Sequence, residues 1–436
     1  MAQRMSRRDA LKTAGLGLGA LGASGLLAAC SSGLKGASGG GGGGSTTTLR
    51  IGYVSPQTGP LASFATGDNF IINKLKPVLS KGFNAGGKTW NIEVVVKDSQ
   101  STTTRATQVT QQLINSDNVD IVVASATPDT ANPVSDACEA AGMPNVTTIV
   151  PWEAWFFGRG KKQGESFNYS TMFFFGMKEF TDLFLHMWKT VGNSGGPVAC
   201  LWPNDTDANA FRAGFPPAMK PAGYTVVDGG AYADGTTDYS AQIAKFKAAG
   251  TELFTCTPIP PDFQVFWKQA AQQGYKPKLA TVAKVMLFPS EAVSLGKLSN
   301  NIATDVWWSP FSPYKSTFDG TSAKQLADEF AKATGSQWTQ ALGSVYSLFE
   351  ISVQALRSAS DPKDRKDVAD KLKNMKISGI SGPLDFTTGP QPGIALQKIS
   401  GGQWRPGSQF PWDMTLVDNT FNPDVPVNGD LQPTNA

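Results

Sequence analysis

From Leu49 onward, short apolar runs alternate with longer segments whose apolar residues recur at helical spacing. The short runs, rich in Val and Ile, predict strands, and the longer segments predict helices. This alternation predicts a parallel sheet with helices on both faces. The first predicted strands span 49–56, 90–99, 119–125 and 144–150, and the helices between and after them span 70–83, 102–116 and 133–142.

The same alternation begins again after an aromatic, loop-like stretch at 151–175. Two similar units in tandem predict an α/β protein with two lobes. Residues 405–436, rich in Pro, Asn and Asp, predict an irregular tail. The second unit contains predicted helices at 179–192, 210–223, 238–250 and 263–274 and predicted strands at 197–203, 224–232, 251–258 and 277–283. Further helices are predicted near 322–334, 340–359 and 363–374, and late strands within 379–389 and 394–404.

The N-terminus does not follow this pattern. A basic segment at 6–12 precedes an apolar stretch at 14–29, which is shorter than the ~20 residues that a membrane-spanning helix needs. Together they predict a signal peptide over 1–29, and the pair Arg7 and Arg8 resembles a twin-arginine export signal. The alternative is a short N-terminal anchor helix.

A lone cysteine closes this segment. The sequence LAAC at 27–30 resembles a bacterial lipobox, in which Cys30 is lipidated and becomes the first residue of the mature chain. Residues 31–48 include six consecutive glycines and contain almost nothing that can be buried, which predicts a flexible tether. We therefore expect the segment 30–48 to hold a folded body just outside a membrane.

Charge and cysteine content narrow the function classes. The chain has a formal net charge of +3, and the predicted signal peptide accounts for all of it, so the mature chain is neutral. A neutral body without a basic block argues against nucleic-acid binding. Cys138, Cys200 and Cys256 follow Cys30, and an odd number of thiols cannot all pair. Buried free thiols are favoured over a bridge between Cys200 and Cys256.

The sequence carries no catalytic motif. It has neither HExxH nor CxxC, and no Ser-His-Asp set can be identified by motif. Its single histidine, His186, lies in an apolar helical segment, where a structural role is favoured. The six glycines precede no strand–turn–helix phosphate site. We therefore expect no catalytic residue, no metal site and no cofactor.

A family resemblance rests on the order and spacing of several segments. IGYVSPQTGPLASFATG places a strand, a tight Thr-Gly-Pro turn and a loop ending in Gly at the start of the first unit. With NAGGKTWNIEVVVKDSQSTTTRATQVTQQLI, YADGTTDYSAQIAKFKAAGTELF and ISGPLDF, it resembles the type I periplasmic binding proteins of the branched-chain amino acid (Leu/Ile/Val) kind, over about 49–404. The resemblance implies two Rossmann-like lobes joined by a three-crossover hinge. Lobe one is then expected over 49–168 plus 304–390, and lobe two over 169–303 plus 391–404.

The resemblance also implies a function. Such receptors enclose a solute between their lobes and deliver it to the permease subunits of an ABC importer. The implied ligand is an amino acid or a related small organic acid, aromatic acids included. Independently, open α/β sheets bind ligands beyond the carboxyl ends of their strands, and hinge closure buries the ligand. The alternatives are a ligand sensor of the same fold that signals to a membrane receptor, and an exported enzyme.

Matching the resemblance residue by residue gives the candidate contacts of lobe one. Phe64 stands where many relatives carry Tyr or Phe against the ligand. Ser125, Thr127 and Thr130 offer hydroxyls to a ligand carboxylate, with help from the following helix N-terminus; the alternative is that they are caps and turn residues. Trp152 stands where relatives have small residues, and its indole favours a flat or bulky ligand. The alternative is that it only covers the lobe.

On lobe two, Trp202, Asp207 and Thr257 follow predicted strands and are expected at the cleft. Lys284 stands, in an ungapped match, where relatives that bind α-amino acids commonly have a glutamate for the ligand's ammonium. If Lys284 faces the cleft, the sign of recognition is reversed, because two like charges ~4 Å apart repel by about 4 kcal/mol at an effective dielectric constant of ~20. Asp207 can still hold an ammonium elsewhere. The alternative is that Lys284 is a surface lysine, solvated or ion-paired.

Overall fold

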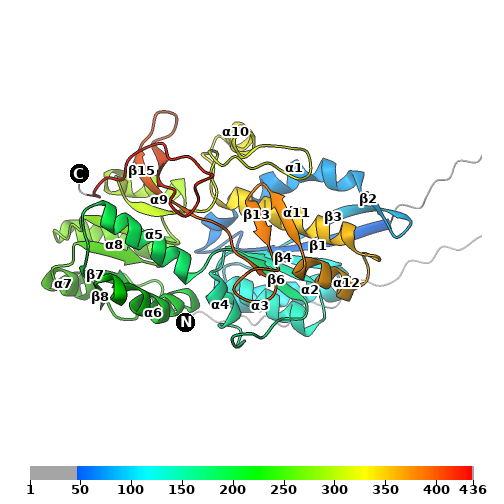
Figure 1. The fold of residues 1–436 in the computed structure, drawn as a ribbon, viewed down its shortest axis with the longest axis horizontal. Coiled ribbons are helices and arrows are strands. Elements are labelled where there is room, and N and C mark those ends of the chain that lie inside the picture. Colours follow the sequence, from blue (N-terminus) through cyan, green and yellow to red (C-terminus); the bar gives the residue numbers. More distant parts are fainter. Residues whose placement is uncertain (1–46, 435–436) are drawn as a thin grey trace, which may run out of the picture. The chain divides into compact units, whose positions relative to one another are not determined.

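The computed structural model describes residues 47–434. The predicted signal peptide, Cys30 and all but the last two residues of the predicted tether lie outside this range. Within it, two seven-stranded sheets with flanking helices form two lobes (Figure 1). The prediction of an α/β protein with two lobes is therefore confirmed.

The sheet of lobe one is parallel apart from one hairpin at its edge. Its strand β4, Ile121–Ser125, is buried throughout, as expected for a parallel strand covered on both faces. β4 lies beside β1, Thr47–Ser55, which in turn pairs with β3, Lys88–Asp98. The order is β14-β6-β5-β4-β1-β3-β2, where the remaining strands are β2 (Phe83–Ala85), β5 (Asn145–Thr148), β6 (Ser170–Phe173) and β14 (Ile394–Ala395).

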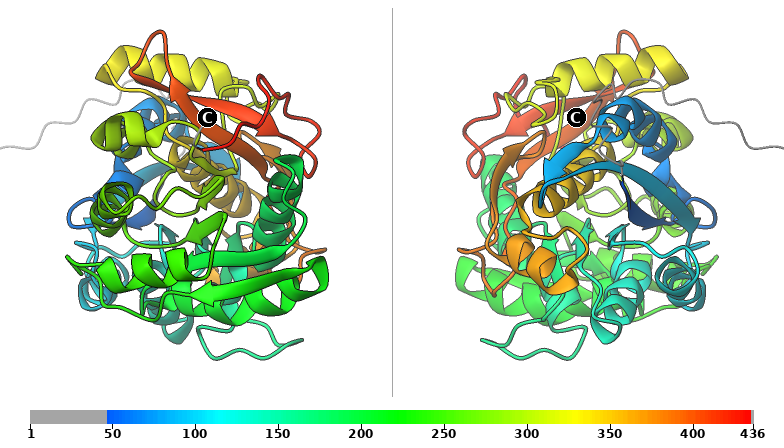
Figure 2. Two further views of the ribbon diagram at one scale, coloured as in Figure 1. Left: turned by 90° about the vertical axis from the view of Figure 1, so that its left-hand side faces the viewer. Right: turned by 90° about the vertical axis from the view of Figure 1, so that its right-hand side faces the viewer.

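The sheet of lobe two is parallel except for its last two strands. Strand β15, Ser400–Pro406, runs antiparallel to both of its neighbours, β11 (Ala303–Val306) and β16 (Trp412–Asp418). β15 also packs against helix α5, Met177–Thr190 (Figure 2). The order is β16-β15-β11-β10-β9-β7-β8, where the remaining strands are β7 (Gly196–Leu201), β8 (Tyr224–Asp228), β9 (Leu253–Cys256) and β10 (Leu279–Val282).

Helices cover both sheets. The most deeply buried is α11, Ala341–Ser358, which packs against β4 and β5 of lobe one. The other helices that follow or cover the lobe-one sheet are α1 (Asp68–Lys81), α2 (Thr103–Asn115), α3 (Pro128–Ala140), α4 (Trp152–Phe156), α10 (Ala323–Thr334) and α12 (Arg365–Lys373). Besides α5, lobe two has α6 (Thr206–Met219), α7 (Ser240–Ala248), α8 (Pro260–Gln272) and α9 (Pro289–Leu295). Short 3-10 helices span Ala62–Ala65 (η1), Lys220–Ala222 (η2) and Gly296–Ser299 (η3), and a hairpin joins β12 (Lys376–Gly379) to β13 (Gly382–Asp385).

Local sequence explains the helix boundaries near the cavity described below. Thr102 caps α2, where its side chain accepts a hydrogen bond from the Arg105 N–H. Asp205 caps α6 in the same way, by accepting from the Ala208 N–H at 2.6 Å. The helix predicted at 210–223 begins at Thr206 and runs to Met219 with Pro216 and Pro217 near its end, and the chain continues as η2.

The chain crosses between the lobes three times, as the three-crossover prediction requires. It leaves lobe one after β6, leaves lobe two after β11, and leaves lobe one again after β14.

The strand assignments correct the predicted lobe boundaries. β6 was expected in lobe two and in a loop-like stretch, but it pairs with β5 in the lobe-one sheet. β14 likewise belongs to lobe one, whereas β11 extends three residues into the predicted lobe-one segment. β16 lies within the predicted irregular tail. Its burial alternates along the strand, which is the pattern of an edge strand, and the Pro and Asn residues around it obscured that signal.

The strand register also decides the question of the disulfide. Cys200 of β7 pairs with Thr255 of β9, and Leu201 pairs with Cys256. Because successive side chains of a strand point to opposite faces, the two thiols lie on opposite sides of the sheet. A bridge between them is excluded, and all three cysteines of the described chain are buried and free. None of the helices within residues 47–434 is long and apolar enough to span a bilayer.

Candidate ligand-binding site

A cavity of about 370 Å³, counting its opening to solvent, lies at the carboxyl ends of strands from both sheets. Its lining residues come from β11 itself and from the loops and helices that follow β1, β4, β5 and β6 of lobe one and β7, β9, β10 and β11 of lobe two. Ligands of open α/β sheets bind at such ends. The lining consists of Phe64, Thr127, Ile149, Pro151, Phe174, Phe175, Phe180, Asp207, Phe211, Thr257, Ala283, Lys284, Leu287, Asp305 and Trp307.

Aromatic residues of two chain crossings form part of the wall. Phe174 and Phe175, directly after β6, stack with ring centroids 4.0 Å apart. Trp307, directly after β11, stands edge-on to Phe174 at 5.0 Å. The Trp307 indole N–H donates to Ser344 Oγ of α11 at 2.9 Å, which fixes the ring. The cavity wall and the hinge therefore share residues, so a change in the angle between the lobes moves these rings.

The two lobes touch directly beside the cavity. Phe64 of η1 meets Phe288 of lobe two edge to face, with ring centroids 4.7 Å apart. Thr206, at the start of α6, donates its hydroxyl hydrogen to Asp129 Oδ1 of α3 at 2.6 Å. Ser63 of η1 also donates to Glu291 of α9 at 3.3 Å, so one apolar and two charge-assisted polar contacts join the lobes in a closed arrangement.

Lys284 forms a buried ion pair in the floor of the cavity. Its Nζ lies 2.7 Å from Asp205 Oδ2 and 3.4 Å from Asp207 Oδ2, and all three side chains are less than a tenth exposed. Burial lowers the pKa of the Lys284 ammonium, but the two carboxylates outweigh burial and the net pKa is raised. Burial raises the pKa of Asp207 to about 6, against the pull of Lys284. The lysine is therefore charged and already paired.

Three buried acceptors in the same wall have no hydrogen-bond partner in the described chain. They are Asp207 Oδ1, Asp305 Oδ2 and Thr257 Oγ1. Asp305, on β11, is 1% exposed, and burial raises its pKa to about 7, with the Asp207 charge adding in the same direction. Unsatisfied buried acceptors are uncommon in folded proteins and indicate a missing donor. No three His, Cys, Asp or Glu side chains within residues 47–434 are grouped so that they could hold a metal ion.

Backbone strain also gathers around the cavity. Ala126, Thr127, Ile149 and Lys284 have positive φ angles, of 58°, 20°, 59° and 67°. Each follows a strand that ends at the cavity, and the last three line it. Such angles are costly for residues other than glycine, above all for a β-branched residue such as Ile149. Strained backbone of this kind concentrates at ligand sites.

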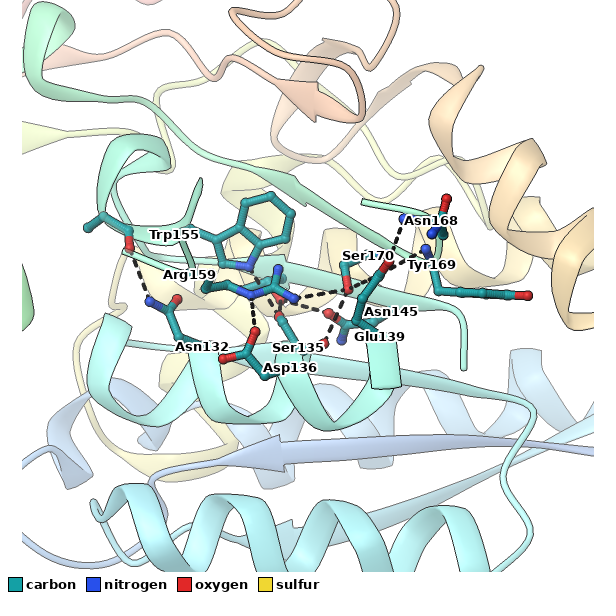
Figure 3. Close-up of polar contacts among 12 residues, drawn as sticks. Asn132, Ser135, Asp136, Glu139, Asn145, Trp155, Arg159, Asn168, Tyr169 and Ser170 are labelled. Carbon is teal, nitrogen blue, oxygen red and sulfur yellow. Dashed lines mark hydrogen bonds and ion pairs between the residues drawn. The ribbon is translucent and has the colours of Figure 1, made fainter. Parts of the chain in front are cut away.

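A polar network behind the cavity holds the loops that carry its lobe-one wall (Figure 3). Glu139 of α3 accepts hydrogen bonds from the backbone N–H groups of Asn168, Tyr169 and Ser170, at 2.5 to 3.1 Å. These bonds fix the start of β6, whose far end leads into Phe174.

The same network holds α4, which follows Pro151. The Trp155 indole N–H donates to Ser135 Oγ of α3 at 3.1 Å, and Asn132 Nδ2 donates to the Ala154 carbonyl at 3.0 Å (Figure 3). Arg159, after α4, pairs with Asp136 at 2.6 Å. The aromatic stretch at 151–175 is thus an anchored part of lobe one.

The structure brings five of the nine predicted ligand contacts to the cavity: Phe64, Thr127, Asp207, Thr257 and Lys284. The other four lie elsewhere. Ser125, Thr130, Trp152 and Trp202 contact other residues of their own lobe; the alternative of cap or turn residues does not hold for Ser125, which lies on β4.

The two hydroxyls that miss the cavity have internal partners. Ser125 Oγ shares a hydrogen bond of 2.9 Å with the hydroxyl of Tyr53. Thr130 donates to the carbonyl of Ala126 at 2.6 Å, within the first turn of α3. Neither hydroxyl lines the cavity, because each side chain points back into lobe one.

The two tryptophans also pack away from the cavity. The ring of Trp152 lies 5.5 Å from that of Phe157 in a tilted arrangement, and its indole lies against Gly176, where an added Cβ would collide with the ring. Trp202 is fully buried with its ring 6.1 Å from Phe215. The strand-end positions were right, but the indoles turn toward the helices that cover each sheet.

Lys284 faces the cavity, but the expected reversal of sign depended on an unpaired ammonium. Asp205 and Asp207 neutralise that charge, and together they leave the group with one excess negative charge when both are ionised. The surface alternative is also wrong in part, because the lysine is ion-paired but buried. Asp205 was missed because an N-cap position explains an aspartate fully.

Asp305 was missed for a different reason. It is a charged residue inside an otherwise apolar strand, in the sequence NIATDVWW, and that conflict with the pattern was the available signal. Phe174, Phe175 and Trp307 were missed because the crossings could not be located to the residue.

Comparison with known proteins now identifies the family. A family model described as periplasmic binding protein matches residues 48–408. The chain belongs to the periplasmic binding protein family. Its members are solute-binding receptors rather than enzymes, and the resemblance derived from the sequence is confirmed.

Solved structures of similar fold agree with the family. The leucine binding protein LivK of Thermotoga maritima has a TM-score of 0.70 and 15% identity, covering 85% of this chain and 99% of its own. LivJ of Streptococcus pneumoniae, a branched-chain amino acid transporter substrate binding protein in complex with isoleucine, has a TM-score of 0.66 and 17% identity, covering 85% and 100%. A solute binding protein of an ABC transporter from Rhodopseudomonas palustris, in complex with 3,4-dihydroxybenzoic acid, has a TM-score of 0.66 and 17% identity, covering 88% and 98%. At these identities the likeness shows the fold.

Proposed function

We propose that this chain is an extracytoplasmic receptor that encloses a small organic molecule between its lobes and delivers it to an ABC importer. The observation that carries the proposal is the cavity at the strand ends, walled by both lobes and by two crossings. Because wall and hinge share Phe174, Phe175 and Trp307, a bound ligand stabilises the closed lobes. Closed lobes offer the permease subunits a surface that open lobes do not.

The proposed ligand is of amino-acid or aromatic-acid size with an apolar part. Six aromatic rings line the cavity, which suits a ligand with an apolar part. The bound isoleucine and 3,4-dihydroxybenzoic acid of two similar structures support ligands of this size. Thr127 and Thr257 are proposed as hydroxyl contacts, and Phe64 as an apolar one.

We further propose that the chain is exported and anchored through a lipid on Cys30, with residues 31–48 as the tether. The support is the LAAC sequence after an apolar stretch with an Arg7–Arg8 pair. The test is Cys30→Ala in the producing cell. We expect loss of labelling by radioactive palmitate and release of the chain from the membrane fraction. Unchanged labelling would contradict lipidation at this position.

Two measurements test the receptor function. Melts of the purified chain are recorded with amino acids, aromatic acids, amines and amides, since a ligand at 100 times its dissociation constant adds about 2.7 kcal/mol of stability. Uptake of the compound that binds is then measured in cells with and without the gene. We expect uptake at low concentration to need the gene. Binding with unchanged uptake would favour the sensor alternative.

A further inference from the structure

Three buried polar atoms in the lobe-two wall of the cavity have no hydrogen-bond partner in the described chain. Asp207 Oδ1 and Asp305 Oδ2 are carboxyl acceptors and Thr257 Oγ1 is a hydroxyl, and the residues that carry them are 5%, 1% and 1% exposed. They come from α6, from β11 and from the residue after β9. Two carboxyl acceptors and a hydroxyl that can also accept, from three separate elements at one cavity, favour a ligand group with more than one N–H.

The charge of the lobe-two wall also favours a ligand with N–H groups that carries a positive charge. Lys284 is the one cationic side chain among the lining residues of the described chain, and Asp205 and Asp207 already hold its Nζ. Asp305 adds a further carboxyl close enough for the Asp207 charge to act on it. A ligand carboxylate would meet excess negative charge, whereas a ligand cation would balance it.

The opposite wall also disfavours a ligand carboxylate. Helix α3 begins at Pro128, which has no N–H to offer, and its next residue is Asp129, an acid in the first turn. The hydroxyls of Ser125 and Thr130 are committed within lobe one. The features that make a helix N-terminus an anion site are therefore weakened here.

The remaining wall suits the body of an organic cation. Phe64, Phe174, Phe175, Phe180, Phe211 and Trp307 line the cavity. Aromatic faces attract a cation through their quadrupole and bury apolar groups at the same time.

We propose that the cavity binds an organic ammonium ion: a protonated primary amine on an apolar body, without a carboxylate. Its N–H groups donate to Asp207 Oδ1, Asp305 Oδ2 and Thr257 Oγ1, and its body lies among the aromatic rings. The inference rests on the proposed receptor function and names the substrate class of the same site.

The test is calorimetric titration of the purified chain with two matched sets of compounds. The first set is 2-phenylethylamine, N-acetyl-2-phenylethylamine, 3-phenylpropionate and phenylalanine. The second is isopentylamine, N-acetylisopentylamine, 4-methylpentanoate and leucine. Within at least one set, we expect the amine to bind 10-fold or more tightly than the neutral amide, the acid and the amino acid.

Variants then test the named contacts. Asp305→Asn should weaken amine binding at least 10-fold and leave the binding of the neutral amide within 3-fold. Thr257→Val is the second variant and should weaken amine binding about 3-fold. Asp68→Asn is the matched control: Asp68 is also 1% exposed and burial raises its pKa to about 7, but it does not line the cavity. It should leave amine affinity unchanged.

The outcomes separate the two proposals. An acid, an amide or an amino acid that binds more tightly than its matched amine overturns the ammonium assignment and leaves the receptor function standing. Equal amine binding by the folded Asp305→Asn variant and the parent overturns the assigned contacts. If no compound of either set binds, the ammonium assignment fails for bodies of this size. If the broader melt panel also gives no ligand, the receptor function fails with it.

Discussion

The two walls of the cavity differ in chemistry although the lobes share a topology. Lobe one supplies apolar side chains and one hydroxyl, whereas lobe two supplies apolar side chains together with an ion-paired lysine, two carboxyls and a hydroxyl. Both sets stand at the ends of parallel strands, so the fold fixes where the residues lie but not their polarity. The polar head of the ligand is therefore expected against lobe two, and its body among apolar side chains of both lobes. The residues compared are Phe64, Ile149, Pro151 and Thr127 on one side and Asp207, Thr257, Lys284 and Asp305 on the other.

The largest effect is expected from removing Lys284, the lysine of the lobe-two wall. In Lys284→Met, Asp205 and Asp207 stay buried without their cation, and breaking a buried pair from one side costs about 3–5 kcal/mol. We expect a loss of that size in the free energy of unfolding, measured by urea denaturation at pH 7.5.

The matched control for this variant is Lys324→Met. Lys324 pairs with Asp328 on the surface of α10, where both side chains are well exposed, so the change should be less than about 1 kcal/mol. Equal effects of the two substitutions would show that Lys284 does not hold a buried pair.

The next effect is the part of the pH dependence of stability that Asp305 of the lobe-two wall contributes. Burial raises the pKa of Asp305 to about 7, above its unfolded value of about 4, so the folded state binds the proton more tightly. Its contribution to stability is complete below pH 4 and is lost as pH rises through 7. Between pH 5 and 7 this amounts to about 2 kcal/mol, at 1.36 kcal/mol per pKa unit. Asp207 and Lys284 are the charged groups that share this wall.

Denaturation of the ligand-free chain between pH 5 and 8 measures this effect. Between pH 5 and 7, the free energy of unfolding of Asp305→Asn should fall by about 2 kcal/mol less than that of the parent. Phe64→Leu, on the other wall, should follow the parent. A bound amine should reverse the trend, because it favours the ionised carboxyl. Parallel curves of unfolding free energy against pH for Asp305→Asn and the parent would show that a group other than Asp305 titrates.

Truncation on the lobe-one wall should have a smaller and less selective effect. Phe64→Ala removes the edge-to-face contact with Phe288 and part of the apolar wall. We expect the affinity for a bound ligand to fall about 10-fold, or about 1.4 kcal/mol. An amine and its neutral amide should lose affinity equally, as calorimetry can show. A loss confined to the amine would mean that Phe64 recognises the charge.

The sequence predicted the alternation of strands and helices well, because each element carries its own signal. The Val-rich run at β4 and the capped segment of α2 are recognisable without their neighbours. The boundaries of strands that form only by pairing with neighbouring strands could not be predicted from the local sequence. The four residues of β6 form a strand only because β5 and β14 lie on either side of them.

For the site, the sequence located strand ends better than side-chain directions. Asp207, Thr257 and Lys284 follow strands, and all three line the cavity. Trp202 also follows a strand, yet its large apolar ring gains more by packing on Phe215 in the interior. The ion pair between Lys284 and Asp205 could not be predicted from the sequence, because 79 residues separate the two along the chain.

The smallest effect should come from the polar contact between the lobes. Thr206→Val keeps the shape of the side chain but removes the hydrogen bond to Asp129, which belongs to neither wall. A hydrogen bond of this kind contributes about 1 kcal/mol, so ligand affinity should fall about 5-fold through a weaker closed state. Thr107→Val is the control, since its hydroxyl bonds only within α2. Since the contact stabilises closure and touches no ligand, amines and neutral amides should lose affinity by the same factor. A loss of affinity confined to amines or to amides would mean that the contact orders the residues of one wall. The comparison between the two walls would then need revision.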